Sequence, residues 1–346
     1  MNLAYIGNSV SAQKGSYKHV LNDLLMEHHF QEAKIIHCTL GGIGSLGISF
    51  FMDRFIGNTE IDLCFIETFV ADAGGATPTY YIPSALKGIL KHDSLKNALI
   101  IPLFLYRSDI TFERCLSIID IYMEVFTAFN LVSVNLFMHI NELFEEGAIF
   151  REEIVYDKVH TTSKGASYYA KYIYEKIKPL LEKNQAEWFN EKKEKDSFEG
   201  GRKHVNSILP KKLEPFTRYI ISGSYSKGLF RLSLPYIKIN RGDSVEVHLG
   251  NFECVGLIVI ADDESGVLDI ERNEEVYSIQ IFDAWCDRAR IQVVIFPKPF
   301  SSFDRFYIKA SNKTNANRTA NLFGIPEIHA GSNIKIVHLM GFEWGA

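Results

Sequence analysis

Two short segments that lie far apart in the sequence carry side chains suited to nucleophilic catalysis. Residues 5–10 read YIGNSV, so an apolar run leads through a glycine turn into Ser9. Residues 157–160 read DKVH, which places Asp157 three residues before His160. A nucleophilic serine needs a base to take its proton, and that base needs a carboxylate to hold its tautomer. Together, the two segments supply the three side chains of a serine-based catalytic triad.

Each segment alone has a simpler interpretation. Ser9 could be only the N-cap of a helix, a position where serine is common. The Asp157 and His160 pair could be surface decoration or half of a metal site. His28 and His29, a separate candidate for a metal site, do not converge on one ion, because adjacent residues on a helix point in different directions, and we expect no metal. The combination of both segments is more specific than either one.

The first half of the chain predicts a scaffold that could bring these segments together. Short unbroken apolar runs alternate with longer amphipathic runs, which is typical of a parallel sheet covered by helices on both faces. Strands are expected at residues 2–6, 33–38, 61–66, 98–105 and 131–135. Helices are expected at residues 17–27, 45–55, 82–91, 112–129 and 163–181. Open α/β sheets hold their ligands at the carboxyl ends of the strands, and Ser9 falls at such an end.

The order and spacing of these segments resemble the SGNH, or GDSL-like, superfamily of serine esterases and acyltransferases. The first block of that family, GDS, is matched by residues 7–9, which read GNS, and its last block, DxxH, is matched by residues 157–160. Thr161 stands where the family often has a proline. The resemblance covers roughly the first half of the chain. It implies a flavodoxin-like three-layer α/β/α domain with Ser9, Asp157 and His160 as the triad.

The resemblance also implies groups that bind the oxyanion, one of them a glycine after the second strand. Residues 38–45 read CTLGGIGS, in which Gly42 is the first candidate and Gly44 the second. These glycines could equally serve only to turn the backbone.

The other implied oxyanion group is an asparagine after the third strand. Residues 61–73 read IDLCFIETFVADA, which resembles the block DLVFxExxVNDA, but Ala71 stands at the asparagine position. Loss of such a donor typically costs about 100- to 1000-fold in turnover. Asn8 and Thr68 are candidates to replace it. Glu67 keeps the acidic residue of the block, either as part of the oxyanion and substrate site or as a buried carboxylate that orders the loop.

After residue 181, the amino-acid composition and the spacing of apolar residues change. Residues 1–181 form the expected catalytic domain, and residues 182–213 are charge-rich and contain a Gly-Gly pair, as expected of a linker. Residues 214–346 consist of short β-branched and aromatic runs separated by turn residues. This spacing predicts an all-β, sandwich-like second domain.

Composition narrows the class of protein further. A net charge of −5 offers no basic face for nucleic acid, so we expect no nucleic-acid partner. The five cysteines are scattered, which favours a reducing compartment over a disulfide framework. The N-terminus lacks the basic and apolar regions of a secretion signal, and no run approaches the roughly 20 apolar residues of a membrane span. A cytoplasmic protein is expected.

The sequence therefore predicts a serine-dependent acyl-ester hydrolase or O-acyltransferase. By analogy with the family, acetyl groups of a carbohydrate or polysaccharide precursor are the expected substrate. Hydrolysis would need no cofactor, whereas a transferase would use acetyl-CoA or another acyl donor. The alternative is a catalytically weak or inactive SGNH-fold protein that binds glycan, for which Ala71 is the best support. The oligomeric state, including a homo-oligomer, stays open.

Overall fold

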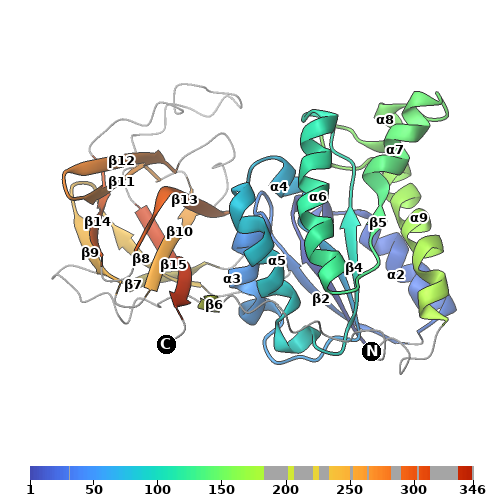
Figure 1. The fold of residues 1–346 in the computed structure, drawn as a ribbon, viewed down its shortest axis with the longest axis horizontal. Helices are drawn as coiled ribbons and strands as arrows, with labels where there is room; N and C mark the ends of the chain where they lie inside the picture. The colour runs from blue at the N-terminus through green and yellow to red at the C-terminus, as the bar shows by residue number, and fades with distance from the viewer. Residues whose placement is uncertain are drawn as a thin grey trace. The chain divides into compact units, whose positions relative to one another are not determined.

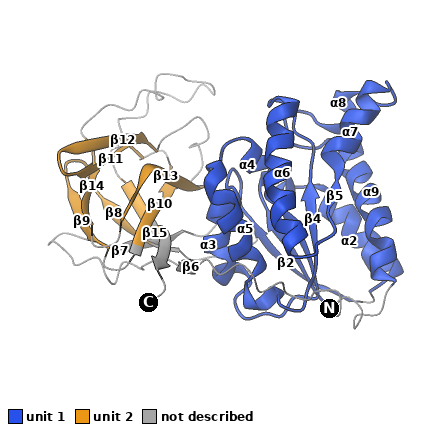
Figure 2. Ribbon diagram, viewed as in Figure 1, with its two compact units in different colours: residues 1–199 blue, residues 200–346 orange. Residues whose placement is uncertain are grey.

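The computed structural model divides into two compact units, residues 1–199 and residues 200–346 (Figure 2). It describes residues 1–30, 32–182, 202–205, 221–225, 234–249, 252–262, 265–281, 290–301, 304–311 and 334–344. Most of the predicted linker, residues 182–213, lies outside these ranges, so its boundaries stay a prediction. Within it, the short strand β6 (Arg202–Val205) pairs with β15 (Ile334–Trp344) of the second unit.

The first unit is built on a five-stranded parallel sheet with the strand order β2-β1-β3-β4-β5. This is the order of flavodoxin-like folds, which confirms the predicted architecture. Gly7 lies opposite both Thr39 and Glu67 in the register, so three neighbouring strands end at the same edge. The strands are β1 (Asn2–Gly7), β2 (Lys34–Thr39), β3 (Leu63–Glu67), β4 (Leu99–Phe104) and β5 (Val134–Asn135).

Helices cover both faces of this sheet, with α2 and α9 on one side and α3, α5 and α6 on the other (Figure 1). The helices are α1 (Ser9–Ala12), α2 (Tyr17–His28), α3 (Ser45–Phe55), α4 (Phe69–Ala73), α5 (Ile82–Leu90), α6 (Phe112–Ala128), α7 (Leu136–Glu145), α8 (Arg151–Ile154) and α9 (Ser163–Leu181). Single 3₁₀ turns lie at Thr79–Tyr81 and Asp93–Leu95. No helix in the described ranges is long and apolar enough to cross a membrane.

Alternation of side chains along the strands decides which residues face α2. Tyr5 stacks on Phe65 of the neighbouring strand at 5.2 Å between ring centroids, and it makes a T-shaped contact with Tyr17 of α2. Residues two positions further along a strand point to the same face. Glu67, two residues after Phe65, therefore also faces α2 and lies beneath the start of the turn that follows β1.

The second unit consists of two antiparallel sheets. One has the order β13-β10-β15-β8-β7, with β6 added on β15, and the other has the order β12-β11-β14-β9. Apolar side chains of both sheets form one buried cluster, and Phe300 of β13 stacks on Phe306 of β14 at 4.3 Å between centroids. This arrangement confirms the predicted all-β sandwich. The remaining strands are β7 (Ile221–Tyr225), β8 (Leu234–Ile239), β9 (Ser244–His248), β10 (Phe252–Ala261), β11 (Val267–Arg272), β12 (Glu275–Gln280), β13 (Arg290–Phe300) and β14 (Arg305–Ala310).

Candidate active site

Ser9 is the first residue of a four-residue helix that follows β1 directly. The Asn8 side chain caps this helix, because its Oδ1 accepts a hydrogen bond from the Val10 N–H at 3.1 Å. Gly7 is needed at the turn, since a Cβ there would lie 2.7 Å from the Glu67 carbonyl oxygen. The glycine lets the end of β1 lie close beside the end of β3, and Ser9 follows at the carboxyl edge of the sheet.

Glu67 lies fully buried beneath this turn. Its Oε1 accepts from the Asn8 amide and its Oε2 from the Ser11 hydroxyl, both at 3.1 Å. Burial raises the pKa of Glu67 to about 8, although hydrogen bonds from Ser11 and Asn8 oppose the rise. With no exposed surface, the carboxyl group orders the turn that carries Ser9. The geometry therefore favours the ordering role over contact with substrate.

The raised pKa of Glu67 makes the stability of the fold depend on pH. Between about 4.5, the ordinary value, and about 8, the folded state keeps a proton that the unfolded chain has lost. The unfolded state then binds fewer protons, so the free energy of unfolding falls as pH rises through this window. We expect Glu67→Gln, which mimics the protonated carboxyl, to flatten this fall and to be more stable than wild type above pH 8 by a few kcal/mol.

Urea unfolding of both proteins at pH 5, 7 and 9 measures this effect. Glu60→Gln serves as the control, because Glu60 is an exposed carboxylate at the opposite edge of the same sheet. Parallel pH dependences for wild type and Glu67→Gln would show that Glu67 does not hold the extra proton.

Gly41, in the loop after β2, lies against Ser9. A Cβ built on Gly41 would lie 3.8 Å from the Ser9 Cβ. Gly42 follows with a φ of 71°, a left-handed conformation that favours glycine. The N–H groups of Ser9, Gly41 and Gly42 have no acceptor among the residues that the structure describes, so each is available to an oxyanion. Gly42 stays a predicted donor, and Gly41 joins it as one that the spacing alone did not single out.

Gly44 has a packing role. A Cβ there would collide with the carboxylate of Asp72 and the hydroxyl of Thr77. The buried Asp72 accepts hydrogen bonds from the Ser45 N–H at 2.9 Å and from the Tyr122 hydroxyl at 2.5 Å. Burial raises the pKa of Asp72 despite these bonds. The glycine thus allows the start of α3 to approach α4 closely, and its role as an oxyanion donor stays a prediction.

In the structure, the side chains of both predicted replacements for the missing asparagine are hydrogen-bonded to other residues. Ala71 lies in α4 and is 8% exposed. Thr68 is fully buried, and its hydroxyl is hydrogen-bonded to the Tyr122 hydroxyl at 2.8 Å. The Asn8 side chain is engaged with both Val10 and Glu67. Both candidate side chains are therefore committed to neighbours that hold the loops in place.

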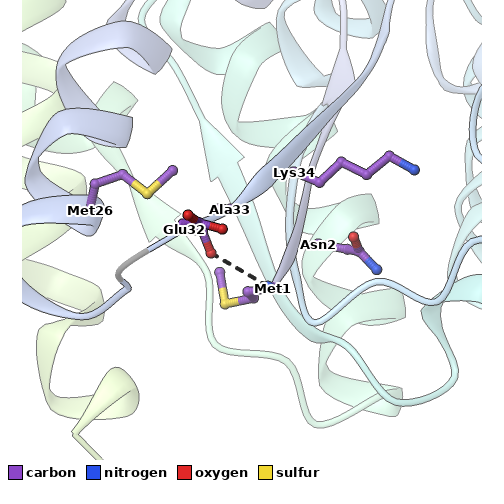
Figure 3. Close-up of a pocket in the computed structure, with 6 residues that line it drawn as sticks. All are labelled: Met1, Asn2, Met26, Glu32, Ala33 and Lys34. Atoms are coloured by element: carbon purple, nitrogen blue, oxygen red, sulfur yellow. Dashed lines mark hydrogen bonds between the residues drawn. The ribbon is translucent and has the colours of Figure 1, made fainter.

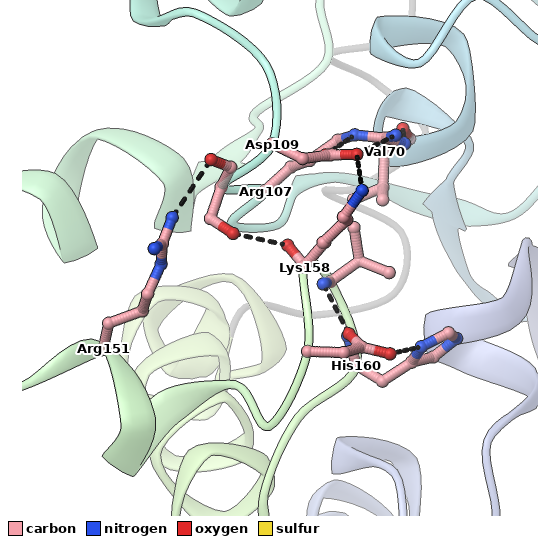
Figure 4. A network of polar contacts seen from close by, with 9 residues as sticks. Val70, Arg107, Asp109, Arg151, Lys158 and His160 are labelled. Carbon is pink, nitrogen blue, oxygen red and sulfur yellow. Dashed lines mark hydrogen bonds and ion pairs between the residues drawn. The ribbon is translucent and has the colours of Figure 1, made fainter.

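Arg107, which the sequence analysis did not single out, connects α4 with the loop after β4 (Figure 4). The Arg107 guanidinium donates to the Val70 carbonyl of α4 at 2.6 Å and pairs with the Asp109 carboxylate through two nitrogens, at 2.7 and 3.2 Å. Asp109 also lies 3.7 Å from the ammonium group of Lys158. The loop after β4 thereby connects α4 to the segment that carries Asp157 and His160. Nothing in the spacing of these residues along the sequence signalled this link.

Asp157 and His160 form the pair that their spacing predicts. Asp157 Oδ2 lies 2.7 Å from His160 Nδ1, while its Oδ1 accepts from the N–H groups of Val159 and His160 at 2.7 Å each. Partial burial by itself would raise the pKa of Asp157, but these hydrogen bonds outweigh it and hold the pKa below its ordinary value. The carboxylate is therefore ionised and fixed, and it engages the imidazole through Nδ1.

The side chain of Gln13 joins the turn that begins at Ser9 to the segment of residues 157–161 by hydrogen bonds to the backbone of Thr161 at 2.8 and 3.2 Å. The Ser9 hydroxyl itself makes no hydrogen bond to any described residue. The assignment of Ser9, Asp157 and His160 as one triad stays a prediction.

The described residues also contain a hollow of about 650 Å³ away from these groups. It lies at the amino ends of β1 and β2, opposite the edge that carries Ser9 (Figure 3). Open α/β sheets bind at the carboxyl ends of their strands, so this hollow is on the wrong edge for the chemistry. Its lining residues are Met1, Asn2, Met26, Glu32, Ala33 and Lys34. No three His, Cys, Asp or Glu side chains of the described part gather closely enough to hold a metal ion.

Comparison with known proteins shows the fold. No protein-family model and no curated protein matches the sequence. Among solved structures, the chain matches a two-domain esterase (CEX) active on acetylated mannans, with a TM-score of 0.68 and 14% identity over 100% of this chain and 92% of that chain. A structure of such an esterase co-crystallized with mannopentaose gives a TM-score of 0.66 and 12% identity over 99% and 92%. The whole chain therefore shares the fold of a two-domain esterase, which confirms the predicted likeness at the level of the fold.

Proposed function

We propose that the protein is a serine esterase that removes acetyl groups from a carbohydrate. The observation that carries this proposal is the Asp157 and His160 pair, which is oriented by three hydrogen bonds and tied to the turn of Ser9. A histidine with a fixed tautomer can act as the general base for a serine whose hydroxyl is not engaged elsewhere, and this supports the assignment of His160 and Ser9 to one site. Hydrolysis through these groups requires no cofactor.

The proposed reaction has two halves. Ser9 Oγ attacks the carbonyl carbon of the acetyl ester and passes its proton to His160 Nε2, and the tetrahedral oxyanion is bound by the N–H groups of Ser9, Gly41 and Gly42. The C–O bond to the sugar then breaks, and the sugar oxygen takes the proton from His160. In the second half, water activated by His160 attacks the acetyl-enzyme and releases acetate and Ser9. An acyltransferase differs only in that a second hydroxyl compound takes the place of water.

An exposed tyrosine next to His160 supports the proposal that the alcohol part of the ester is a sugar. Tyr156 is 64% exposed, and its ring lies nearly parallel to the His160 imidazole, at 18° and 6.0 Å between centroids. A flat apolar face with a hydroxyl at its rim suits the C–H face and hydroxyls of a pyranose. The fold neighbours described as active on acetylated mannans and as co-crystallized with mannopentaose agree with this substrate class.

We expect Tyr156→Ala to raise KM for acetylated mannooligosaccharides about tenfold, because a lost stacking contact of about 1.4 kcal/mol corresponds to that factor. The value of kcat/KM for p-nitrophenyl acetate, which carries no sugar, should stay within about twofold. Phe150→Ala is the matched control, since Phe150 is an equally exposed aromatic residue, at 68%, with no ring contact to His160 among the described residues. An equal change on both substrates would place Tyr156 in support of His160 and not in the sugar site.

Release of acetate from acetylated mannooligosaccharides and xylooligosaccharides by the purified protein tests the function itself. Wild type should release acetate and the Ser9→Ala variant should not. Adding an unacetylated oligosaccharide distinguishes hydrolysis from transfer. An esterase releases the same amount of acetate and leaves the added sugar unacetylated, whereas a transferase acetylates it. Binding of the oligosaccharide without any acetate release would support the alternative of an inactive glycan-binding protein, which Ala71 favours.

A further inference from the structure

We propose that Gln13 is a positioning residue that sets the distance between Ser9 and His160. This inference rests on the proposed function, because it assigns a role within the same triad. Gln13 touches neither the ester nor the reacting atoms in the proposed mechanism. It acts through the two backbone segments that carry the nucleophile and the base.

Gln13 makes a reciprocal pair of hydrogen bonds with one residue of the opposite segment. Its side-chain Nε2 donates to the Thr161 carbonyl at 2.8 Å, and its Oε1 accepts from the Thr161 N–H at 3.2 Å. The two residues are 148 positions apart in the sequence. A side-chain amide that satisfies both the backbone N–H and the backbone C=O of one residue fixes direction as well as distance.

Each end of this link is rigidly coupled to a catalytic group. On one side, the Gln13 N–H donates to the Ser9 carbonyl at 2.9 Å, so the side chain leaves from the same helical turn that begins at Ser9. On the other side, Thr161 directly follows His160, and the Tyr156 N–H donates to the His160 carbonyl at 3.0 Å. A shift of Gln13 relative to Thr161 is therefore a shift of Ser9 relative to His160.

The segment of residues 157–161 is also held by contacts with the loop after β4, and these contacts do not involve the turn of Ser9. Lys158 is held by the Ser108 N–H, which donates to its carbonyl at 3.0 Å, and by the Asp109 carboxylate. Both belong to the loop after β4. Within the part of the chain that the structure describes, the two bonds of Gln13 are the hydrogen bonds that join the turn of Ser9 to this segment.

Removal of this link should affect turnover more than binding. A misplacement of about 1 Å between reacting groups can cost about 100-fold in rate, whereas the sugar contacts stay in place. For Gln13→Met, which keeps the length of the side chain and deletes both hydrogen bonds, we expect kcat to fall about 10- to 100-fold and KM to stay within about twofold. The rate at which a fluorophosphonate labels Ser9 should fall in parallel, because this reaction also depends on the alignment of Ser9 with His160.

Asn2→Leu is the matched control. The Asn2 amide donates to the Glu60 carbonyl at 2.7 Å, across 58 positions, at the other end of the same strand that leads to Ser9. Its loss removes one amide-to-backbone tie of the same chemical kind from the same unit. Thermal melting should report a comparable decrease in Tm for both variants, while only Gln13→Met should lose kcat. Gln13→Glu is the second variant, because it keeps size and polarity but turns a carboxylate oxygen towards the Thr161 carbonyl, and it should lose kcat as well.

The outcomes separate this inference from the proposed function. An active wild type together with Gln13→Met and Gln13→Glu variants that retain kcat and the labelling rate would overturn the positioning role while leaving the esterase intact. A loss of kcat in Asn2→Leu equal to that in Gln13→Met would overturn it too, since any weakened tie would then have the same effect. A folded wild type that neither releases acetate nor is labelled at Ser9 overturns both proposals.

Discussion

Ser9→Ala is expected to lower kcat/KM for acetyl esters by about 10⁴-fold or more, to the level left by binding and oxyanion contacts alone. The reason is that, in the proposed mechanism, the oxygen of the Ser9 hydroxyl forms the acyl-enzyme, and the nearby described serine hydroxyl is already engaged. Ser11, two residues further along the same helix, is buried and hydrogen-bonded to Tyr17 at 2.8 Å and to Glu67 at 3.1 Å. Its hydroxyl is occupied with holding the turn.

Two measurements check this expectation. Acetate release gives the loss of activity, and intact mass after exposure to a fluorophosphonate shows whether one serine is labelled in wild type and none in the variant. Ser94→Ala is the control, because Ser94 is a serine of the same unit whose hydroxyl donates to the Gly57 carbonyl at 2.6 Å, outside the site. Activity that survives in Ser9→Ala would mean that the nucleophile is another residue, and the peptide that carries the label would identify it.

Asp157→Asn is expected to lower kcat by about 10⁴-fold with little change in KM. An asparagine keeps the shape of the aspartate and can still accept from the Val159 and His160 N–H groups with its oxygen. Its amide group then turns to His160 Nδ1 and can only donate there. The imidazole proton is driven to Nε2, which can no longer take the proton of Ser9. The segment should therefore stay folded while the base is disabled.

The molecule contains a second aspartate and histidine pair that serves as the control for this substitution. Asp53 Oδ1 lies 2.8 Å from His92 Nε2, a distance close to the 2.7 Å between Asp157 and His160. Asp53→Asn should leave kcat unchanged, because neither residue belongs to the proposed site. Comparable losses in the two variants, or a fall in kcat for Asp157→Asn of less than about tenfold, would argue against Asp157 as the residue that orients the base.

Much of the first unit could be predicted from the sequence because its signals are local. The helices over residues 45–55 and 163–181 begin and end in the structure where apolar periodicity placed them. The helix α7 escaped prediction because it follows β5 without an intervening turn. Asn135, which closes that strand, caps the helix by accepting from the Met138 N–H at 3.0 Å, and this capping residue was the signal that could have revealed it.

In the candidate site, too, local features could be predicted from the sequence and long-range ones could not. The pairing of Asp157 with His160 follows from three residues of spacing in one turn, and the structure forms it. The glycine beside Ser9 could not be chosen in the same way: the sequence favoured Gly42 and then Gly44, whereas the structure places Gly41 against Ser9. Their positions depend on the register of β2 against β1 and on the collision that a side chain at Gly44 would cause with Asp72.

By itself, the sequence determined the kinds of side chain that could act in catalysis, the helices and strands with regular periodicity, and the change from an α/β to an all-β unit. Only the tertiary structure decided that Glu67 is buried under the turn, that Arg107 connects α4 to the loop after β4, and that Gln13 meets Thr161. The physical reason is the range of the interactions involved. Periodicity and capping act over a few residues, whereas burial and side-chain pairing depend on segments that become neighbours only when the sheet has formed.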